Sequence, residues 1–416
     1  MMSEELANIL RLHERYVTGV PGGRKADLRL KDLVGLKLDE RNLEGAALAG
    51  ADLATASLKK ANLKGADLYG ANLRGADLSG ANLASADLRG ARLADANLFG
   101  ADLTKADLRV GQFAHSTKKI TRQNMSDEEK QRARKLREEV AETDLSGASL
   151  VTAELEMADM QGADLSGANL QKANLTGATL SKANLRGANL SESNLTRANF
   201  SDSFLLGASF RGALFISVNM RGADVDEASL PADLDSLPDE VRTRILDHNL
   251  WIRSNGARGQ RAEFERTDLH GLNFAGINMS GMHLRWVNLQ KAKLHDALFI
   301  LTNLAGADLS GANLDNADFD GATLAKATLK GASLKGAKFG PVAIHRPGAQ
   351  ATGQLWGANL TGVQLQDADL SGASFREANV RGVDFAGAKL EKTRFEKCQM
   401  DEGIAVRLGA GGAIVS

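Results

Sequence analysis

The side chains that could bind a metal or attack a substrate are few in this sequence and widely spaced. The closest histidines are His270, His283 and His295, and Cys398 is the single cysteine. Imidazole and thiolate groups are the usual ligands of zinc, and a thiolate is also a nucleophile. Because there is one cysteine, an intramolecular disulfide and a cysteine-based zinc cluster are both excluded.

Glycines and carboxylates are abundant, but they recur regularly and do not gather into a phosphate-binding or acid–base site. The phosphate-binding pattern G-x-x-x-x-G-K-[ST] does not occur. Asp or Asn often stands one residue before a leucine, as Asn42, Asn62 and Asn82 do. This spacing is better explained by a ladder of hydrogen-bonding side chains than by paired catalytic carboxylates. We therefore expect no enzymatic activity and no cofactor.

The charge balance points to no nucleic acid and to no anionic membrane as a direct partner. The 416 residues include 51 Lys+Arg and 52 Asp+Glu, which gives a formal net charge of -1. The first residues, Met1 to Glu5, contain two acids and no apolar signal segment. No stretch approaches the roughly 18 apolar residues that a membrane-spanning helix needs. We expect a cytoplasmic protein without a membrane partner.

A large apolar residue recurs at every fifth position, with a small residue, usually alanine, two positions before it. Five residues turn through about 140° net on an α-helix, and alternate positions of a strand face opposite sides, so neither element could bury all of these residues. A short extended piece followed by a turn points them all inward, and the chain must therefore coil. Four runs carry the pattern, namely Leu28 to Phe113, Leu145 to Leu230, Phe264 to Phe339 and Leu355 to Met400.

The fifth place of the unit predicts the corners of this coil. Glycine is frequent there, which suits a corner with positive φ. Lys60, Ser85, Asp95 and Lys105 also stand at this place, so we expect turns of mixed type.

The repeating unit Ala-Asp/Asn-Leu-x-Gly, seen from Ala66 to Gly75, resembles that of the pentapeptide-repeat family. The resemblance covers most of the chain. It implies an all-β solenoid, a right-handed quadrilateral β-helix with four pentapeptides in each coil. On such a coil the ligands of one metal would be about 20 residues apart; the three histidines are not, so we predict no metal site. Cys398 takes an inward place and is predicted to be a buried small side chain.

The breaks in the repeat predict two tandem copies of a capping helix followed by a solenoid. Residues Leu10–Val17 correspond at a constant offset to Ile245–Ile252, and both segments precede a run. We expect the first helix to begin behind Ser3, and the second behind Asp235 or Ser236 with Pro238 in its first turn. A helix would cover the exposed end of each solenoid. The predicted domains are 1–234 and 235–416, and His13 and His248 are interpreted as cap residues.

Three segments outside the repeat are also predicted. The insert at 114–143 contains a charged helix from Ser126 to Thr143, which either lies on the solenoid or contacts a partner. The segment 340–354, Gly340 to Gln354, is expected to form a projecting loop. In the tail 401–416, Ile404, Val406 and Leu408 alternate like a short strand. Similarity to relatives that protect DNA gyrase implies a possible homodimer through this C-terminal end.

Outward apolar side chains are the candidate contacts for a protein partner, because a solenoid that binds nothing would expose few of them. The leading hypothesis is a non-enzymatic protein-binding scaffold whose partner is unidentified. One alternative, from the family resemblance, is a DNA-mimicking modulator of gyrase, a type II topoisomerase, although only the second run is acidic, with 10 acids and 6 bases. Another is a self-assembling spacer. The candidate contact residues are Phe204, Leu206, Leu214, Ile216, Trp286, Leu298, Ile300 and Trp356.

Overall fold

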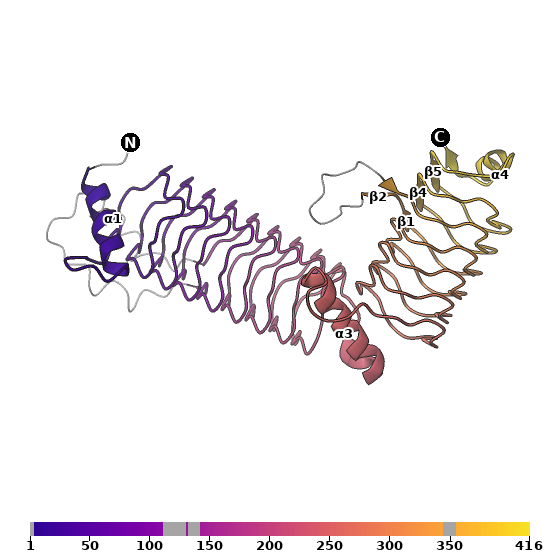
Figure 1. The fold of residues 1–416 in the computed structure, drawn as a ribbon, viewed down its shortest axis with the longest axis horizontal. Helices are drawn as coiled ribbons and strands as arrows, with labels where there is room; N and C mark the ends of the chain where they lie inside the picture. The colour runs from indigo at the N-terminus through magenta and orange to yellow at the C-terminus, as the bar shows by residue number, and fades with distance from the viewer. Residues whose placement is uncertain (1–3, 111–129, 132–141, 344–354) are drawn as a thin grey trace. The chain divides into compact units, whose positions relative to one another are not determined.

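The computed structural model describes residues 4–110, 130–131, 142–343 and 355–416. The chain forms two compact units, Met1–Phe210 with Phe215–Ser229, and Arg211–Leu214 with Leu230–Ser416. Each unit is a stack of coils that begins next to a helix (Figure 1). The predicted helix from Ser126 to Thr143 lies outside the described residues except for Lys130, Gln131, Glu142 and Thr143.

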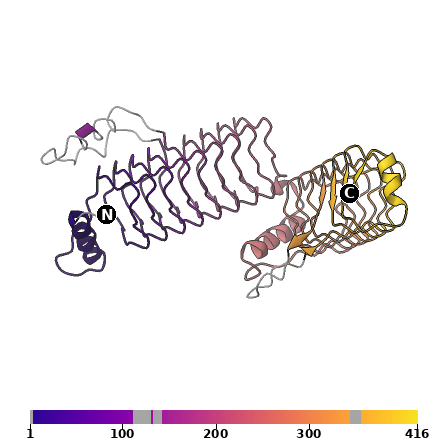
Figure 2. The same cartoon turned by 90° about the horizontal axis from the view of Figure 1, so that it is seen from above.

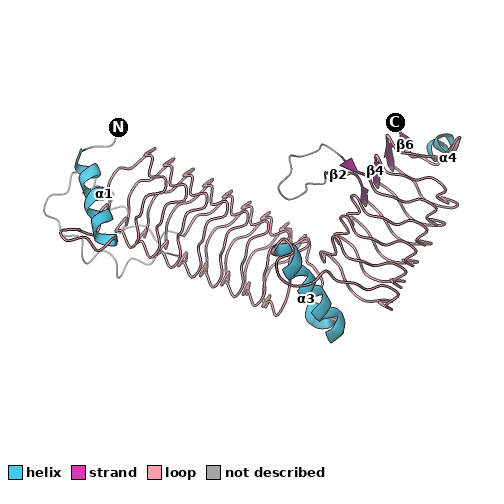
Figure 3. Cartoon of the chain, in the orientation of Figure 1, coloured by secondary structure: helices cyan, strands magenta, loops and turns pink. Residues whose placement is uncertain are grey.

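The coils are held together by parallel pairing between residues 20 positions apart. Asn42 pairs with Asn62, and Asn62 pairs with Asn82. The backbone N–H of Leu63 donates to Asn82 O at 2.7 Å, and the N–H of Asn82 donates to Ala61 O at 2.9 Å. Four pentapeptides therefore make one coil, as the family resemblance implied. Because each pairing is one residue wide, most of each coil is drawn as loop (Figure 3).

The core of each unit is a column of inward alanines and leucines. Ala61 and Leu63, for example, are both fully buried. In the second unit, phenylalanine replaces leucine at five stacked positions, and neighbouring rings lie nearly parallel with their centroids 4.5 to 4.9 Å apart. The stacked rings belong to Phe299, Phe319, Phe339, Phe375 and Phe395.

The expectation of mixed turn types is wrong, because glycine and non-glycine corners share one conformation. The φ angle is 54° at Lys60 and 58° at Lys105, close to the 62° of Gly65. Across the corner at Thr55, Ala56 N–H donates to Leu53 O at 3.0 Å, and this bond with a positive φ at the third residue is the pattern of a type II turn. The corner N–H must also reach the next coil, as Lys60 N–H reaches Ser79 O at 2.9 Å, which fixes the corner whatever residue occupies it.

The coil register continues past both inserts. Arg92 pairs with Asp144 across the first insert, and Thr323 pairs with Asn359 across the second. Around the second insert lie β1 (Lys338–Phe339), β2 (Val342–Ala343) and β3 (Leu355–Trp356), and β2 pairs antiparallel with β3. The predicted loop between them lies outside the described residues from 344 to 354. Leu355 was expected to be inward, but it belongs to this hairpin and is 48% exposed.

Helices α1 (Glu4–Val17) and α3 (Asp239–Arg253) lie where the capping helices were predicted, beside the first coils of their units (Figures 1 and 2). Ser3 lies outside the described residues. The predicted N-cap of the second helix is wrong, since Pro238 is the N-cap residue and makes no side-chain cap bond. The reason is a 3₁₀ helix, η2 (Leu234–Ser236), which precedes α3 and is capped by the side chain of Asp233.

The C-terminal tail continues the last coil, but not with the predicted strand. The segment expected to alternate forms α4 (Ile404–Ala410), which leaves Val406 78% exposed and Leu408 buried. Gly403, with φ of 75°, begins this helix. The closing strand is β6 (Ile414–Val415), which pairs parallel with β5 (Arg394–Glu396), and β5 pairs in turn with β4 (Ser374–Arg376).

Candidate protein-binding surface

No constellation suited to catalysis appears among the residues that the structure describes. These residues contain no group of three or more His, Cys, Asp and Glu side chains that could hold a metal. Cys398 is half-buried, its Sγ donates to Phe375 O at 3.1 Å, and burial raises the pKa of its thiol. A thiol with a raised pKa is less ionised and so less nucleophilic at neutral pH.

The cap histidines make structural contacts, and the two copies match. The Nδ1 atom of His13 accepts a hydrogen bond from Ala26 N–H at 3.0 Å, and Nδ1 of His248 accepts one from Ala262 N–H at 3.2 Å. In His248, Nε2 lies 3.0 Å from Ser280 O and serves as the donor. Burial lowers the pKa of His13, and it lowers that of His248 to about 4. Both rings are therefore neutral anchors of the first coil.

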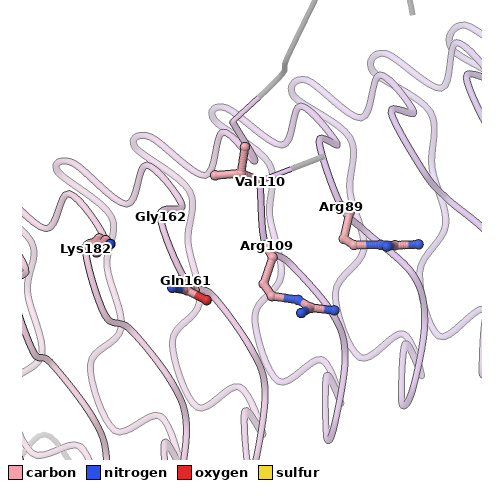
Figure 4. A pocket seen from close by; sticks show the side chains of 6 residues that line it. All are labelled: Arg89, Arg109, Val110, Gln161, Gly162 and Lys182. Carbon is pink, nitrogen blue, oxygen red and sulfur yellow. The ribbon is translucent and has the colours of Figure 1, made fainter. Parts of the chain in front are cut away.

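A depression of about 440 Å³ lies on the first unit and is lined by basic side chains (Figure 4). Arg89 pairs with Asp87 at 2.6 Å, and Arg109 pairs with Asp107 at 2.7 Å. The Nε of Arg109 also lies 3.3 Å from Asp159 of the next coil. These carboxylates neutralise the two arginines, which leaves Lys182 as the one lining cation without an ion pair to a described residue.

In the first unit, the predicted contacts are only partly exposed. Phe204 and Leu206 are 41% and 39% exposed, and the guanidinium of Arg186 lies over the Phe204 ring, 4.8 Å from its centroid. Ile216 is half-buried, and so is Leu214, which belongs to the second unit. Leu214 and Ile216 are thus less exposed than Phe204 and Leu206.

Leu298 was also expected to face solvent, but it is buried. It pairs with Asn278 and Asp318, which are buried as well. Arg211, from the same unit, lies over this column, with its Nη2 atom 3.8 Å from Asp318 and 2.9 Å from Asn316 O. Ile300, two residues farther along, is half-buried.

Trp286 is the most distinctive of the predicted contacts. It stands at a corner with φ of 53° and is 42% exposed. The guanidinium groups of Arg285 and Arg266 lie over its ring, 4.1 and 4.7 Å from the centroid. Cation–π contacts of this kind hold an aromatic side chain in one orientation while it stays exposed.

The β2–β3 hairpin brings Trp356 to an apolar corner together with a residue that the sequence reasoning missed. Around Gly321, a Cβ atom would meet Leu301 Cδ2, Val342 Cγ2 and Trp356 O. Leu301 is 39% exposed and Trp356 is 49% exposed. The signal for Leu301 was present in the sequence, since a leucine at a corner position must face outward.

Over five successive coils, the surface between the Leu301 corner and the Trp286 corner has no acidic side chain, whereas Glu263 and Glu265 stand one coil before it and Asp401 one coil after it. We call it the acid-free face and define it by ten outward residues in five successive coils. Parallel pairings and coil-to-coil hydrogen bonds place them in two adjacent columns. The columns are His283, Asn303, Thr323, Asn359 and Asn379, and Arg285, Ala305, Ala325, Thr361 and Arg381.

The pattern of the Pentapeptide repeats family matches eight segments of the chain. No curated protein matches it. Within the described residues, no helix is long and apolar enough to cross a membrane. The matched segments are 42–75, 76–109, 140–167, 158–197, 193–230, 256–300, 302–340 and 354–402.

Among solved structures, the chain is similar to HetL from the cyanobacterium Nostoc sp. strain PCC 7120, a pentapeptide repeat protein involved in heterocyst differentiation regulation. The two are 23% identical, the match covers 96% of this chain and 95% of HetL, and the TM-score is 0.17. Full-length QnrB1, a plasmid-mediated fluoroquinolone resistance protein, is 15% identical over 64% of this chain and 90% of its own, with a TM-score of 0.15. These TM-scores carry no structural argument. The repeat matches, which span more than half of the sequence, show that the chain belongs to the pentapeptide-repeat family.

Proposed function

We propose that this protein is a non-enzymatic scaffold that binds another protein through the acid-free face and the apolar side chains at its borders. The observation that carries the proposal is Trp286, an exposed indole held by Arg266 and Arg285 at the edge of a flat face. Tryptophan and arginine are the residue types most enriched at the centres of protein interfaces. Leu301 and Trp356 supply apolar area at the opposite edge.

The face suits binding better than chemistry. Its columns follow the stacking of the coils, so its backbone is fixed and little conformational entropy is lost when a partner docks. The face is also flat, whereas an enzyme needs a concave site that excludes water.

The proposal is tested by affinity capture from a lysate of the host cell, followed by a binding measurement with the captured protein in purified form. Trp286→Ala is compared with Phe99→Ala, since Phe99 is 53% exposed but lies in the first unit. We expect Trp286→Ala to weaken the Kd by at least about tenfold, the effect of losing an interface hot spot. Phe99→Ala should leave it within about twofold.

An unchanged Kd for Trp286→Ala would contradict this function. The two alternatives predict other results. A DNA mimic would capture subunits of a type II topoisomerase, and a spacer would form filaments as its concentration rises.

A further inference from the structure

The second unit distributes its carboxylates unevenly over its four faces. The acid-free face has none in five coils, whereas each of the other three faces carries two or more over the same coils. These acids are Asp308 and Asp384 on one face, Asp315, Asp369 and Glu391 on the next, and Asp318, Asp320 and Glu396 on the third.

The cations of the acid-free face have no partner of opposite charge within the described part of the chain. Arg285 and Arg381 lie on the face, Lys326 stands at its corner, and none of the three makes an ion pair with a described residue. Arg89 and Arg109 of the first unit differ in this respect, since each is paired with aspartate. Over these five coils, the face and its two corners therefore carry three cations without an ion pair and one acid, Glu377 at the Leu301 corner column, which pairs with Arg376.

The asparagine side chains of the acid-free face also offer hydrogen-bond donors. Asn303 Oδ1 accepts from Ala305 N–H at 3.2 Å, and Asn359 and Asn379 accept in the same way from the residue two positions on. The acceptor of each amide is thus used, and its Nδ2 group makes no hydrogen bond to a described residue. At some other positions the Nδ2 group is used along the ladder, as when Asn288 donates to Asp268 at 2.9 Å. The acid-free face is consequently rich in unused donors and poor in acceptors.

Resting on the proposed function, we infer that the partner segment held on the acid-free face is an extended acidic stretch of polypeptide that also carries apolar side chains. Its carboxylates would meet Arg285, Lys326 and Arg381, and its apolar side chains would contact Trp286 and the Leu301 corner. Arg285 and Arg381 are four coils apart, or about 19 Å at 4.8 Å per coil, which is the length of about six extended residues.

Single-stranded nucleic acid is the other polyanion to consider, and the structure favours it less. Two guanidinium groups already lie over the Trp286 ring, where a base would stack. The formal net charge of -1 also lacks the basic excess typical of nucleic-acid-binding proteins.

The test uses the full chain and three fluorescein-labelled probes of matched length. The first is a peptide of about ten residues that repeats Glu-Glu-Leu, the second repeats Lys-Lys-Leu, and the third is an oligothymidylate. Binding is measured by fluorescence anisotropy at low salt and at physiological salt. The variants are Arg285→Glu with Arg381→Glu, and a matched control, Lys293→Glu with Lys389→Glu. The control pair lies in one column of another face, also four coils apart.

We expect the glutamate peptide to bind the wild type and the control, to bind the face variant at least about tenfold more weakly, and to lose affinity as salt rises. The lysine peptide and the oligothymidylate should bind the wild type more weakly than the glutamate peptide does. The inference is overturned if both variants lose the glutamate peptide equally, if neither does, or if oligothymidylate binds more tightly. If the captured protein needs Trp286 but the glutamate peptide does not bind, the acidic chemistry is wrong and the scaffold function stands.

Discussion

The indole of Trp286 lies against Gly306, the residue at the same corner of the next coil. A Cβ atom at residue 306 would overlap Cδ1 and Nε1 of the indole. The absence of a side chain at Gly306 therefore lets Trp286 lie flat along the edge of the acid-free face.

Replacing Gly306 by alanine should displace Trp286 without unfolding the unit. We expect a shift in the emission of Trp286, measured in a background in which Trp251 and Trp356 are phenylalanine, and weaker partner binding. Gly331→Ala is the control, because Gly331 has a similar φ of 63° but nothing within 4 Å of the added atom. Both variants carry the left-handed backbone cost of about 1–2 kcal/mol. An equal spectral shift in the two would show that Gly306 does not position the indole.

Because the pKa of His248 is lowered in the folded chain, we predict that the free energy of unfolding falls in mild acid. His248 has a pKa of about 4 in the folded chain and about 6.5 when unfolded, so the unfolded chain binds the proton more readily. Stability is full above pH 6.5 and declines as the pH falls toward 4, by on the order of 3 kcal/mol for this group.

Urea unfolding of His248→Gln checks this expectation. The variant should be less stable than the wild type at neutral pH, because the Ala262 N–H loses its acceptor, and it should lose less stability on acidification. His270→Gln, at an exposed position, serves as the control. If His248→Gln and the wild type lose the same stability on acidification, the imidazole of His248 does not have the lowered pKa on which this prediction rests.

The phenylalanine stack should be a major source of stability for the second unit. Phe319 is fully buried between the rings of Phe299 and Phe339. Phe319→Ala is expected to lower the free energy of unfolding by about 3–5 kcal/mol, through lost burial and the cavity that remains. Phe99→Ala, at an exposed position, should change it by less than about 0.5 kcal/mol. Equal effects in urea unfolding would contradict the role of the stack.

Strained corners offer stabilising substitutions. Lys105 has φ of 58°, a conformation that costs a residue with a side chain more than it costs glycine. Lys105→Gly should therefore raise the melting temperature, with a gain of up to about 1 kcal/mol. Lys64→Gly, one position before a corner, should lower it, since it adds only backbone entropy to the unfolded chain. A loss at both positions would mean that the corner conformation carries no strain.

The period of five predicted most of the inward residues, because such positions must reach the same narrow core; Val225 and Leu355, which are 36% and 48% exposed, are exceptions. The capping helices could also be predicted, because the end of a stack of coils exposes its core and needs to be covered. The burial of Leu298 could not be predicted in this way. Arg211, which is distant in sequence, is placed over that column by tertiary contacts with Asp296 and Asp318.

The helix in the C-terminal tail and the acid-free face were not predicted from the sequence, for different reasons. Ile404, Val406 and Leu408 alternate as a strand does, but Gly403 begins a helix that buries only Leu408 of the three. The acid-free face becomes visible only when the coils are aligned across the hairpin. Thr323 pairs with Asn359, which is 36 positions later in the sequence and not 20, so a fixed period places Asn359 and Arg381 in the wrong columns.

Hydroxyl-radical footprinting of the complex with the captured partner tests the central claim most directly. The oxidation of each exposed aromatic residue is compared in the free and the bound protein. We predict that Trp286 and Trp356 are protected in the complex, while Phe99 and Phe204 in the first unit are oxidised as in the free protein. Protection of Phe204 with no change at Trp286 would contradict the assignment of the acid-free face as the binding surface.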